Sequence, residues 1–370
     1  MTIRKILQKN FKSFFQTLFK ILYGKIIIAK DPKNIPLKKI NVNEIFINNK
    51  KYNLDNNIYN ISNGRIFTDT QENVAIIKDN FIIPEISYQQ VNGELKSTNY
   101  NSVLYKGTNK ILRKKNGKVF CLVQGDSGNN YFHFIFDIIT KLRIYQEKFS
   151  LSDIDYFYVP GINAWQKKIL SLFEINEDKI IDSNNFRHIK SSEIIAVDHP
   201  WYKKGFVQQE IKNLPEWSIF YLREKFLKFK KKFNASKKIF IDRSDSLYNH
   251  CKLVNNQEVI KFLENRGFKS YKVSKLDFFE QIYLFNNAEI IISPHGAALT
   301  NIIFSEPNLK LFELIPNNHG SVKCERISNF LKFEYIRISL DPLTQHQNGD
   351  IKIEIDELEK IIKSKSINLK

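Results

Sequence analysis

The last third of the chain alternates short apolar runs with segments whose apolar residues recur every three or four positions. The first pattern predicts buried strands and the second predicts amphipathic helices. The predicted strands are 238–242, 269–273, 288–293, 309–315 and 333–338, and the predicted helices are 255–266, 277–286, 297–305 and 321–331. This alternation predicts a parallel sheet with helices on both faces, which binds ligands outside the carboxyl ends of its strands.

The same rhythm of strand and helix begins after Gly117. It predicts strands at 119–123, 154–159, 178–182 and 191–197 and helices at 130–148 and 163–174. Between 40 and 118, short apolar runs separated by turns that contain Asn, Asp and Gly predict a strand-rich region. The polar end of a long charged segment at 207–233 is the expected passage between two halves of an α/β protein.

The first 29 residues place apolar side chains at helical spacing, with basic side chains between them. The apolar positions are Ile3, Ile6, Leu7, Phe11, Phe14, Phe15, Leu18, Phe19 and Leu22, and the basic ones are Arg4, Lys5, Lys9, Lys12 and Lys20. This pattern predicts a basic amphipathic helix. Two interpretations are open: the helix lies on an anionic membrane face, or its Phe stripe packs against the protein's own body.

The composition narrows the class of protein. A chain of 370 residues with 42% hydrophobic content is long enough for two or three domains, and it is not a disordered chain. The net charge of +18 suits polyanionic partners such as nucleic acid, anionic lipid or sugar nucleotides. An AT-rich coding sequence would also enrich Lys, Asn, Ile and Phe, so charge alone does not choose among these partners.

The three cysteines, Cys121, Cys251 and Cys324, are widely spaced and form no C-x-x-C pair. We therefore expect neither a disulfide framework nor a structural zinc site, and a reducing compartment. No apolar run reaches about 18 residues, which argues against a transmembrane helix, and no signal-peptide cleavage site follows the first helix. These features predict a cytoplasmic protein.

The strongest local signal is the segment 290–301, in which an apolar strand breaks at Pro-His-Gly and restarts as a helix. A helix N-terminus offers unpaired backbone N–H groups, and Gly296 lets a ligand approach the backbone closely, so this corner suits a phosphate. His295 at its mouth can donate to a diphosphate oxygen. The alternative is that His295 only caps the helix and Gly296 only permits the turn.

Two further polar positions fall at strand ends of the same predicted sheet. Arg243 and Ser244 follow the strand 238–242, where an Arg fork can hold a phosphate. Glu313 lies near the exit of the strand 309–315, before the loop 316–320, and can accept hydrogen bonds from ribose hydroxyls. A surface turn for Arg243 and an ordinary ion pair for Glu313 are the alternatives.

In the first half, a Gly-rich loop at 125–130 leads into a helix that carries His133 and Asp137. These two residues are four positions apart, so they share one face of the helix. A carboxylate beside an imidazole can orient a general base. Thr140 and Lys141 extend the same stripe, so the alternative is a solvent-exposed face of the helix.

Other signatures are weak or missing. The triplet Asp153-Ile154-Asp155 has the D-x-D form that holds a divalent metal in some nucleotide-sugar enzymes, but such triplets arise by chance and this one opens a predicted strand. We expect no metal site. The sequence contains no nucleophile elbow, Walker A loop or dinucleotide-binding glycine motif.

The motifs in this order resemble glycosyltransferase family 61, a family of inverting enzymes that includes bacterial capsular polysaccharide transferases. The resemblance spans about 125–316 and rests on the segments 130–137, 241–244, 267–268, 279–281 and 293–301, together with Glu313. It implies a GT-B-like fold, with two Rossmann-like domains facing a cleft. The implied domains are a basic helix (1–30), a strand-rich region with the acceptor-side domain (31–232), the nucleotide-sugar-binding domain (233–345) and a C-terminal helix (346–370).

The resemblance also implies roles for the candidate residues. His133 and Asp137 would be the catalytic pair, and Asn130 and Tyr131 would belong to the acceptor-side loop. The residues implied to contact the nucleotide sugar are Arg243, Ser244, His295, Gly296, Ala297, Asn301 and Glu313. The donor would be a nucleotide sugar, namely a UDP-sugar, used without a metal or other cofactor. The acceptor would be a glycan or lipid-linked glycan at the inner membrane face.

This sequence departs from the family pattern at a few positions. Lys252 stands near a second family Arg, Asn255-Asn256 replace an Asn-Glu pair, and His133-Phe134 replace His-Trp. The rival functions are a catalytically degenerate nucleotide-sugar-binding protein and a polyanion or nucleic-acid binder. The second rival has little support, because the lysines are scattered and no nucleic-acid motif is present.

Overall fold

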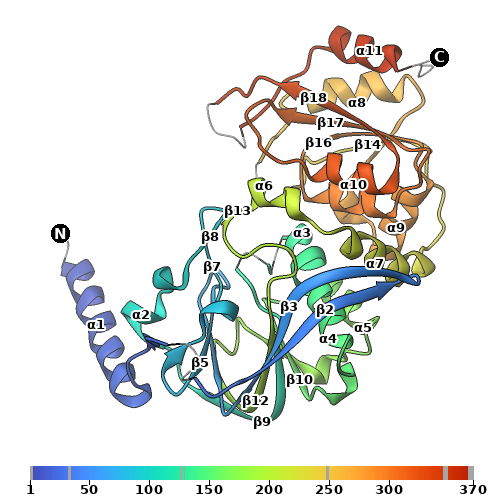
Figure 1. Ribbon diagram of the computed structural model, residues 1–370. Helices are drawn as coiled ribbons and strands as arrows, with labels where there is room; N and C mark the ends of the chain where they lie inside the picture. The colour runs from blue at the N-terminus through green and yellow to red at the C-terminus, as the bar shows by residue number, and fades with distance from the viewer. Residues whose placement is uncertain are drawn as a thin grey trace. The chain divides into compact units, whose positions relative to one another are not determined.

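The computed structural model describes residues 3–31, 35–125, 127–128, 130–246, 250–344 and 349–365 (Figure 1). The undescribed positions include parts of the predicted helix 1–30, of the predicted loop 125–130 and of the predicted C-terminal helix. The chain forms two compact units, Met1–Val207 and Gln208–Lys370, and the class is mixed α/β as predicted.

The boundary between the units precedes the predicted position at 232/233. The reason is that α7 (Glu216–Phe226) is bonded into the second unit. Arg223 of this helix donates to the backbone oxygens of Ile303 (2.6 Å) and Ser305 (2.7 Å). Residues 208–233, whose polar end was the expected passage, are therefore part of the second unit. They include η7 (Ile211–Asn213) and η8 (Leu227–Phe229), and α6 (Val207–Glu210) begins at the boundary.

The first unit is built on a ten-stranded sheet. Four of its strands are parallel, in the order β12-β9-β10-β11, and they are the predicted ones: β9 (Arg113–Cys121), β10 (Tyr156–Val159), β11 (Ile180–Asp182) and β12 (His188–Val197). Val119 of β9 pairs with Ile194 of β12. Since β9 and β12 are parallel neighbours, their carboxyl ends lie at the same edge of the sheet. The candidate site around His133 and Asp137 forms at this edge.

Antiparallel strands extend this sheet and confirm the predicted strand-rich region. They are β2 (Lys38–Ile47), β3 (Lys50–Ser62), β4 (Arg65–Thr68), β5 (Val74–Lys78) and β6 (Phe81–Ile82), and β1 (Ile27–Ile28) joins β6 in parallel. A three-stranded sheet contains β7 (Gln89–Val91), β8 (Glu94–Lys96) and β13 (Gly205–Phe206). Short helices lie in the connections: η2 (Pro84–Ile86), η3 (Thr98–Tyr100), α2 (Val103–Lys106), η5 (Leu151–Asp153) and η6 (Glu177–Lys179).

One helical segment fills the predicted range 130–148, but it is not a uniform α-helix. It consists of α3 (Tyr131–His133), the π-helical turn η4 (Phe134–Ile139) and α4 (Thr140–Gln146). All six residues of the π-helical turn are buried. Short π-helical insertions are rare and occur mostly at functional sites. The next predicted helix is α5 (Ala164–Ser171).

The C-terminal part of helix α1 (Ile3–Tyr23) contacts the rest of the first unit. The Tyr23 ring stacks on Phe19 and meets His188 edge-on, and the Tyr23 hydroxyl accepts the backbone N–H of Leu112 (3.1 Å). Four large apolar side chains stay exposed: Phe11 (66%), Phe14 (63%), Ile21 (76%) and Leu22 (60%). The Phe stripe is therefore only partly covered by the protein's own body. Within the described residues, no helix is long and apolar enough to cross a membrane.

The second unit contains the predicted parallel sheet, with all five strands close to their predicted positions. They are β14 (Lys238–Ile241), β15 (Lys269–Tyr271), β16 (Ile290–Pro294), β17 (Lys310–Pro316) and β18 (Glu334–Leu340). Their spatial order is β15-β14-β16-β17-β18. After β14 the chain forms β15 next to one side edge of β14 and then crosses over to form β16 next to the other side edge. The carboxyl ends of β14 and β16 thus flank the topological switch point where doubly wound sheets bind ligands.

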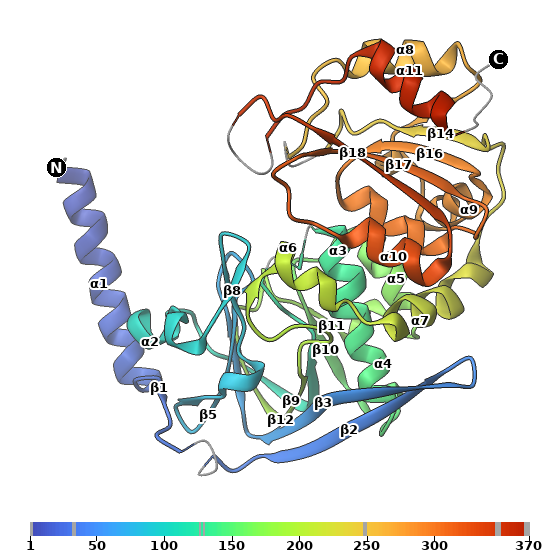
Figure 2. The ribbon, with the colours of Figure 1, turned by 45° about the horizontal axis from the view of Figure 1, so that its top comes forward.

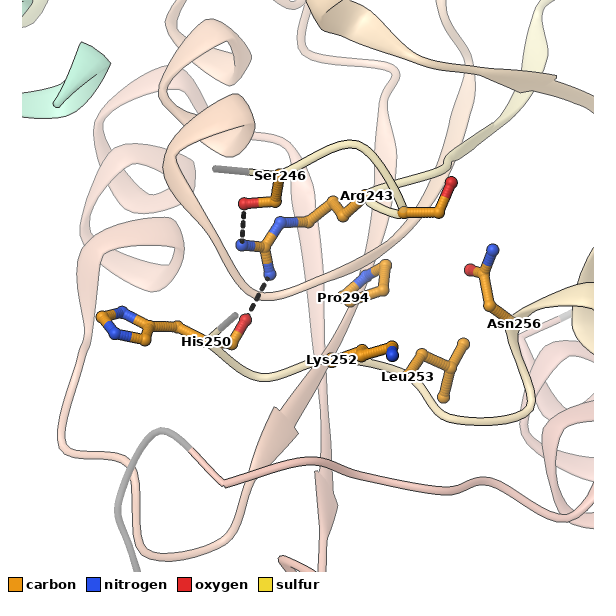
Figure 3. A pocket seen from close by; sticks show the side chains of 8 residues that line it. Arg243, Ser246, His250, Lys252, Leu253, Asn256 and Pro294 are labelled. Atoms are coloured by element: carbon orange, nitrogen blue, oxygen red, sulfur yellow. Dashed lines mark hydrogen bonds between the residues drawn. The ribbon is translucent and has the colours of Figure 1, made fainter. Parts of the chain in front are cut away.

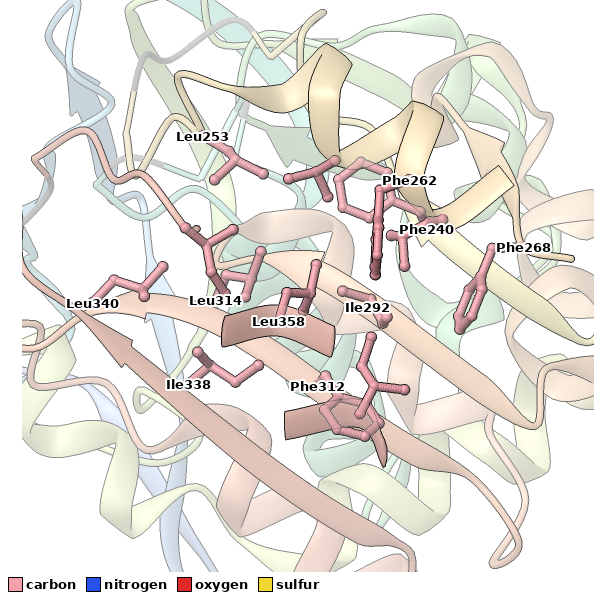
Figure 4. Packing of buried hydrophobic residues seen from close by; sticks show 14 of the residues in the cluster. Phe240, Leu253, Phe262, Phe268, Ile292, Phe312, Leu314, Ile338, Leu340 and Leu358 are labelled. Carbon is pink, nitrogen blue, oxygen red and sulfur yellow. The ribbon is translucent and has the colours of Figure 1, made fainter. Parts of the chain in front are cut away.

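Helices cover both faces of this sheet (Figure 2). Figure 4 shows the core on one face, where Phe240, Ile292, Phe312 and Ile338 from successive strands pack against Leu358 and its neighbours. The helices on this face are α8 (Asn256–Glu264) and α11 (Ile355–Ser364), and α9 (Phe278–Asn287) and α10 (Lys323–Leu331) lie on the other. A short η9 (Val273–Lys275) precedes α9. Of the predicted C-terminal helix 346–370, the described part is helical at 355–364.

The predicted helix 297–305 is a 3₁₀ helix, η10 (Ala297–Phe304). Its tighter winding still starts directly after β16, as the sequence indicated. The three cysteines are buried and free, in agreement with the expected absence of a disulfide framework. Burial raises the pKa of Cys121 to about 12 and that of Cys251 to about 11, so these thiols stay protonated and unreactive.

Candidate active site

A pocket of about 80 Å³ opens at the switch point of the second unit. Its lining comes from the carboxyl ends of β14 and β16 and from the segment that leads to α8: Arg243, Ser244, Ser246, His250, Lys252, Leu253, Asn256 and Pro294. Figure 3 shows the Arg243 guanidinium and the Lys252 side chain among these residues. Two cations over a strand end are suited to a small, highly charged group such as a diphosphate.

Arg243 is held in place by the backbone around it. Its guanidinium donates to the carbonyl oxygens of His295 and His250, the latter at 3.0 Å, and reaches Ser246 Oγ at 3.4 Å. These bonds join the loops after β14 and β16. The sequence predicted that Arg243 and His295 would meet at one sheet edge, and the structure brings them into contact.

Gly296 is required by a close approach of side chains. A Cβ atom at this position would collide with the guanidinium of Arg243. On its other side, the ammonium of Lys323 donates to the Gly296 carbonyl oxygen (2.8 Å) and is itself buried. The corner between β16 and η10 is therefore flanked by two cations, and Ala297 follows directly as the first residue of η10.

His295 is bonded to Glu313 in the next strand. Their side chains meet at 2.6 Å between Nδ1 and Oε1, and Glu313 also accepts from Tyr335 (2.7 Å) and from the Cys324 thiol (3.3 Å). Burial raises the pKa of Glu313, but its interactions with His295, including the hydrogen bond from the ring, and with Lys323 outweigh burial and hold this pKa at about 2. Because Glu313 is ionised, Nδ1 of His295 carries the hydrogen of this bond.

The carboxylate of Glu313 is 1% exposed and both its oxygens are engaged. The predicted hydrogen bonds to ribose hydroxyls would need these partners to be displaced. The geometry instead makes Glu313 the residue that fixes the ring of His295. Burial lowers the pKa of His295 and Glu313 raises it, and burial together with the charges of Lys323 and Arg243 outweighs Glu313, so the ring is neutral near pH 7.

His319 is a neighbour that the sequence analysis did not single out. Its ring lies 4.2 Å from that of His295, centroid to centroid. Burial and the adjacent His295 lower the pKa of His319 to about 3, so it too is neutral. Arg337 donates to the carbonyl oxygens of His319 (2.6 Å) and Ser321 (2.9 Å) and so holds the loop 316–320. The sequence feature that could have pointed to His319 is that the loop 316–320 follows the carboxyl end of strand β17.

Ser244 and Asn256 meet at Asp242, the residue directly after β14. Asp242 accepts the backbone N–H of Ser244 (2.9 Å), its hydroxyl (3.1 Å) and the side-chain amide of Asn256 (2.9 Å). The Asp242 carboxylate thus positions Ser244 and Asn256, two residues that line the pocket. Asn256, at the position where the family pattern has a Glu, lines the pocket with an uncharged amide.

Asn301 does not face the pocket, in contrast to its predicted role. Its side chain is fully buried and donates to Gln281 of α9 (3.0 Å). Gln281 in turn donates to the carbonyl oxygens of Val273 (3.1 Å) and Leu276 (3.0 Å). Asn301 therefore ties η10 to α9.

In the first unit, His133 and Asp137 form the predicted pair. His133 Nδ1 lies 2.6 Å from Asp137 Oδ2, across the start of the π-helical turn. Burial raises the pKa of Asp137, but attraction to His133 and His199 and their hydrogen bonds outweigh it and hold this pKa below its ordinary value. The ionised carboxylate fixes the hydrogen of His133 on Nδ1, which leaves Nε2 as the basic ring atom.

Asp137 is completely buried and has further partners at the ends of β9 and β12. The indole N–H of Trp201 donates to its Oδ1 (2.7 Å), and the amide of Gln124 donates to its Oδ2 (3.0 Å). His199 Nε2 lies 2.6 Å from Gln124 Nε2, and burial lowers the pKa of His199 to about 4. Asp137 has no exposed surface, and its carboxylate orients the ring of His133.

Sequence reasoning missed Gln124, His199 and Trp201. Each follows a strand of the parallel part of the sheet, and the strand-end rule that pointed to Arg243 would have found them. The alternative of a solvent-exposed helix face is wrong, because Thr140 and Lys141 are buried with Asp137.

The two acceptor-side candidates have local contacts. Asn130 caps the helical segment, since its side chain accepts the backbone N–H of Phe132 (3.0 Å) and of His133 (3.4 Å). The Tyr131 ring meets Trp165 of α5 edge-on at 5.5 Å. Asn130 therefore stabilises the first turn of the helical segment that contains His133.

Asp155, the second carboxylate of the D-x-D triplet, has a structural role. Asp155 accepts the backbone N–H of Lys118 (2.6 Å), next to Gly117, where a side chain would collide with this carboxylate. Over the described ranges, no group of three or more His, Cys, Asp or Glu side chains has an arrangement that holds a metal ion.

A doubly wound sheet with cationic groups at its switch point is the arrangement of nucleotide-binding α/β proteins. The sequence model of glycosyltransferase family 61 matches residues 131–312, a range that contains His133, Asp137, Arg243 and His295. The chain belongs to this family and is a glycosyltransferase. Membership implies a nucleotide-sugar donor and a glycan acceptor in general. Comparison with curated proteins gives no match.

Proposed function

We propose that this protein is an inverting glycosyltransferase that uses a UDP-sugar without a metal ion and builds a capsule or other surface polysaccharide. The observation that carries the proposal is the pocket at the switch point of the second unit, which is lined by Arg243 and Lys252 and in which Arg243 also donates to the His295 carbonyl oxygen. The family pattern supports a GT-B arrangement of two Rossmann-like domains.

The donor diphosphate would lie against Arg243 and Lys252. During transfer the leaving diphosphate gains negative charge, and donors fixed beforehand stabilise that charge where it develops. Arg243 is such a donor, fixed by two carbonyl oxygens, and His295, which Glu313 orients, becomes a second one when its Nε2 is protonated. Lys323 adds a buried positive charge behind Gly296. These cations supply the charge that a divalent metal supplies in other transferases, which supports a metal-independent reaction.

The acceptor hydroxyl would be deprotonated by His133. Inversion requires a base that takes the proton of the attacking hydroxyl on the face opposite the leaving group. Nε2 of His133 is the basic atom of a ring that Asp137 orients, and Asp137, Gln124 and Trp201 form a bonded set around it. Asp137 also stabilises the imidazolium that forms when His133 accepts the proton.

Peripheral contact with an anionic membrane is part of the proposal. Phe11, Phe14, Ile21 and Leu22 of α1 are exposed, and residues 1–30 contain seven basic and no acidic residues. An exposed apolar stripe on a basic helix inserts into the interface of an anionic bilayer. Such a contact would bring the enzyme to lipid-linked acceptors.

The experiment that tests the donor site is calorimetric binding of UDP in the presence of EDTA, with three variants. K252A removes a pocket cation and should weaken UDP binding about tenfold or more, since a charge-assisted hydrogen bond contributes roughly 1.5–3 kcal/mol. K252R restores the family's Arg and should retain or tighten binding, because a planar fork binds phosphate with two bonds. K261A removes an exposed lysine of α8 that does not line the pocket and is the matched control.

Catalysis is tested separately by hydrolysis of the UDP-sugar, with water as the acceptor. H133Q should bind UDP as the unchanged protein does and lose about 10²–10⁴-fold in rate, because only the base is removed. Binding that needs a divalent metal contradicts the metal-free site. Binding without turnover by the unchanged protein, with any acceptor, would identify it as a degenerate nucleotide-sugar-binding protein.

A further inference from the structure

The first unit contains a second and larger pocket, of about 430 Å³. This volume lies in the range of roughly 300–1,000 Å³ that small-molecule sites occupy. Its walls are the end of β4 with the loop 69–73, strand β7, the segment from Tyr100 to Lys110, and Arg187 before β12. No residue of the candidate active site lines it.

The lining of this pocket is rich in groups that bind sugar hydroxyls. Thr70, Gln71, Ser102 and Asn109 contribute amide or hydroxyl side chains to the lining. The side chains of Thr68, Asn73 and Gln89 also line it but are hydrogen-bonded within the protein. Such groups both donate and accept hydrogen bonds, as hydroxyls do. The ring of Tyr100, 61% exposed, adds an apolar face of the kind on which a sugar ring can rest.

The pocket is also positively charged. Lys106, Lys110 and Arg187 line it together with a single carboxylate, Asp69. The Asp69 carboxylate is already satisfied by the backbone N–H groups of Gln71 (2.8 Å) and Asn73 (3.1 Å). Arg187 is fixed through the Asp69 carbonyl oxygen and Asn184 (2.9 Å). The excess positive charge favours an anionic ligand.

The loop 69–73 connects this pocket to the loop that precedes His133. Asp69, Thr70, Gln71 and Asn73 line the pocket. Glu72, between them, instead accepts the backbone N–H of Gly128, the Ser127 hydroxyl (3.4 Å) and the backbone N–H of Gly161 (3.1 Å). Residues 127–128 lead to Asn130, which caps the helix that carries His133. One tight loop thus joins the pocket wall to the proposed acceptor side.

From this juxtaposition we propose that the pocket is a subsite for an anionic part of the acceptor saccharide. It holds acidic groups and hydroxyls of the acceptor at a distance from the reacting hydroxyl, and the loop 69–73 sets its position relative to the loop before His133. The inference rests on the proposed function, because it needs a glycan acceptor. It adds the class of acceptor: an acidic saccharide.

The test measures saccharide binding by calorimetry without any donor. The probes are trigalacturonate, the neutral maltotriose, and tricarballylate as an anion without sugar rings. Trigalacturonate should bind at least about tenfold more tightly than either of the others, because it alone offers both charge and hydroxyls. Absence of trigalacturonate binding, or equal binding of tricarballylate, overturns the proposal.

Charge-reversal variants locate the binding. Lys106 and Lys110 have exposed side chains, so K106E/K110E should fold normally, as a thermal melt confirms, and should lose trigalacturonate binding at least tenfold. K38E/K148E reverses two exposed lysines of the same unit that do not line the pocket and should bind as the unchanged protein does. Equal losses in both double variants overturn the site.

A parallel titration with UDP separates this inference from the proposed function. UDP should bind K106E/K110E and the unchanged protein equally, because the donor pocket lies in the second unit. If UDP binds but trigalacturonate does not, only the acceptor subsite is wrong. If neither binds the unchanged protein, the donor site of the proposed function fails as well.

Discussion

His295 shows how one hydrogen bond decides what a side chain can do. Its Nδ1–H is committed to Glu313, so only Nε2 is left to meet a phosphate, and it must be protonated to donate. Burial and nearby cations lower the pKa of the free ring, whereas a bound diphosphate would raise it. Binding of a nucleotide sugar should therefore take up a proton.

This coupling predicts a pH dependence of donor binding. With UDP-glucose, whose diphosphate does not titrate near neutral pH, the Kd should rise as pH increases between the pKa of free His295, below 6.5, and its raised pKa in the complex. H295Q should bind more weakly at pH 6 and lose this dependence. The measurement is calorimetric Kd from pH 5.5 to 8, with H188N as a control outside the donor site. Equal pH slopes in H295Q and the unchanged protein would show that His295 does not meet the phosphate.

At the scale of elements, hydrophobic periodicity located helices and strands but not their winding. The ranges 130–148 and 297–305 are helical, yet one contains a π-helical turn and the other is a 3₁₀ helix. The apolar spacing of a helix differs little among these windings over one or two turns. What selects them is the packing of neighbouring groups: Asp137 must reach partners on two strand ends, and η10 must leave β16 beside Arg243.

Helix α1 is the element whose exposed face carries a membrane prediction. F14E/L22E replaces two exposed apolar side chains with charges and should reduce binding to phosphatidylglycerol vesicles about tenfold or more, since it removes apolar burial and adds repulsion. Co-sedimentation measures the bound fraction, and phosphatidylcholine vesicles should bind little in every case.

The matched control for this prediction is S13E/T17E, which adds the same charge at exposed polar positions of α1. It should lose much less binding. If both double variants lose binding equally, the charge of the helix matters and its apolar stripe does not. Retention of binding by F14E/L22E would mean that α1 is not the contact.

For the whole molecule, buried neutral histidines make stability sensitive to acid. Burial lowers the pKa of His188 and of His199 to about 4 and that of His319 to about 3, and it also lowers the pKa of His295. The unfolded chain binds these protons near pH 6.5, so it is favoured as pH falls. The free energy of unfolding should be flat above about pH 7 with respect to these groups and fall steeply below 6.5.

His188 offers the cleanest single test of this effect, because it lies away from both candidate sites. Its Nδ1 meets the Lys110 carbonyl oxygen (3.0 Å), and its shift corresponds to about 3 kcal/mol lost between pH 6.5 and 4. H188N keeps a donor for that oxygen but cannot titrate. Urea unfolding at pH 7.5 and 5 should show a smaller acid loss for H188N than for the unchanged protein. An equal loss in both would mean that His188 is not buried in its neutral form.

The sequence by itself determined the elements and the class of protein. Apolar runs and helical spacing fix strands and helices locally, and alternation fixes a parallel sheet, so Arg243, His295 and Glu313 were found through the strand-end rule. The pairing of His133 with Asp137 follows from helical spacing. The short motifs, taken in their order along the chain, were enough to indicate the family. Each motif falls at the end of a predicted strand or the start of a predicted helix, which agrees with the predicted elements.

Only the tertiary structure decided which side chains meet across long separations. Trp201 reaches Asp137 and Tyr335 reaches Glu313 because parallel strands bring distant loops to one edge. It also joined Asn301 to Gln281 and assigned α7 to the second unit through Arg223. Local spacing carries no information on these contacts, since they depend on strand order and register, which are set by packing of the whole sheet.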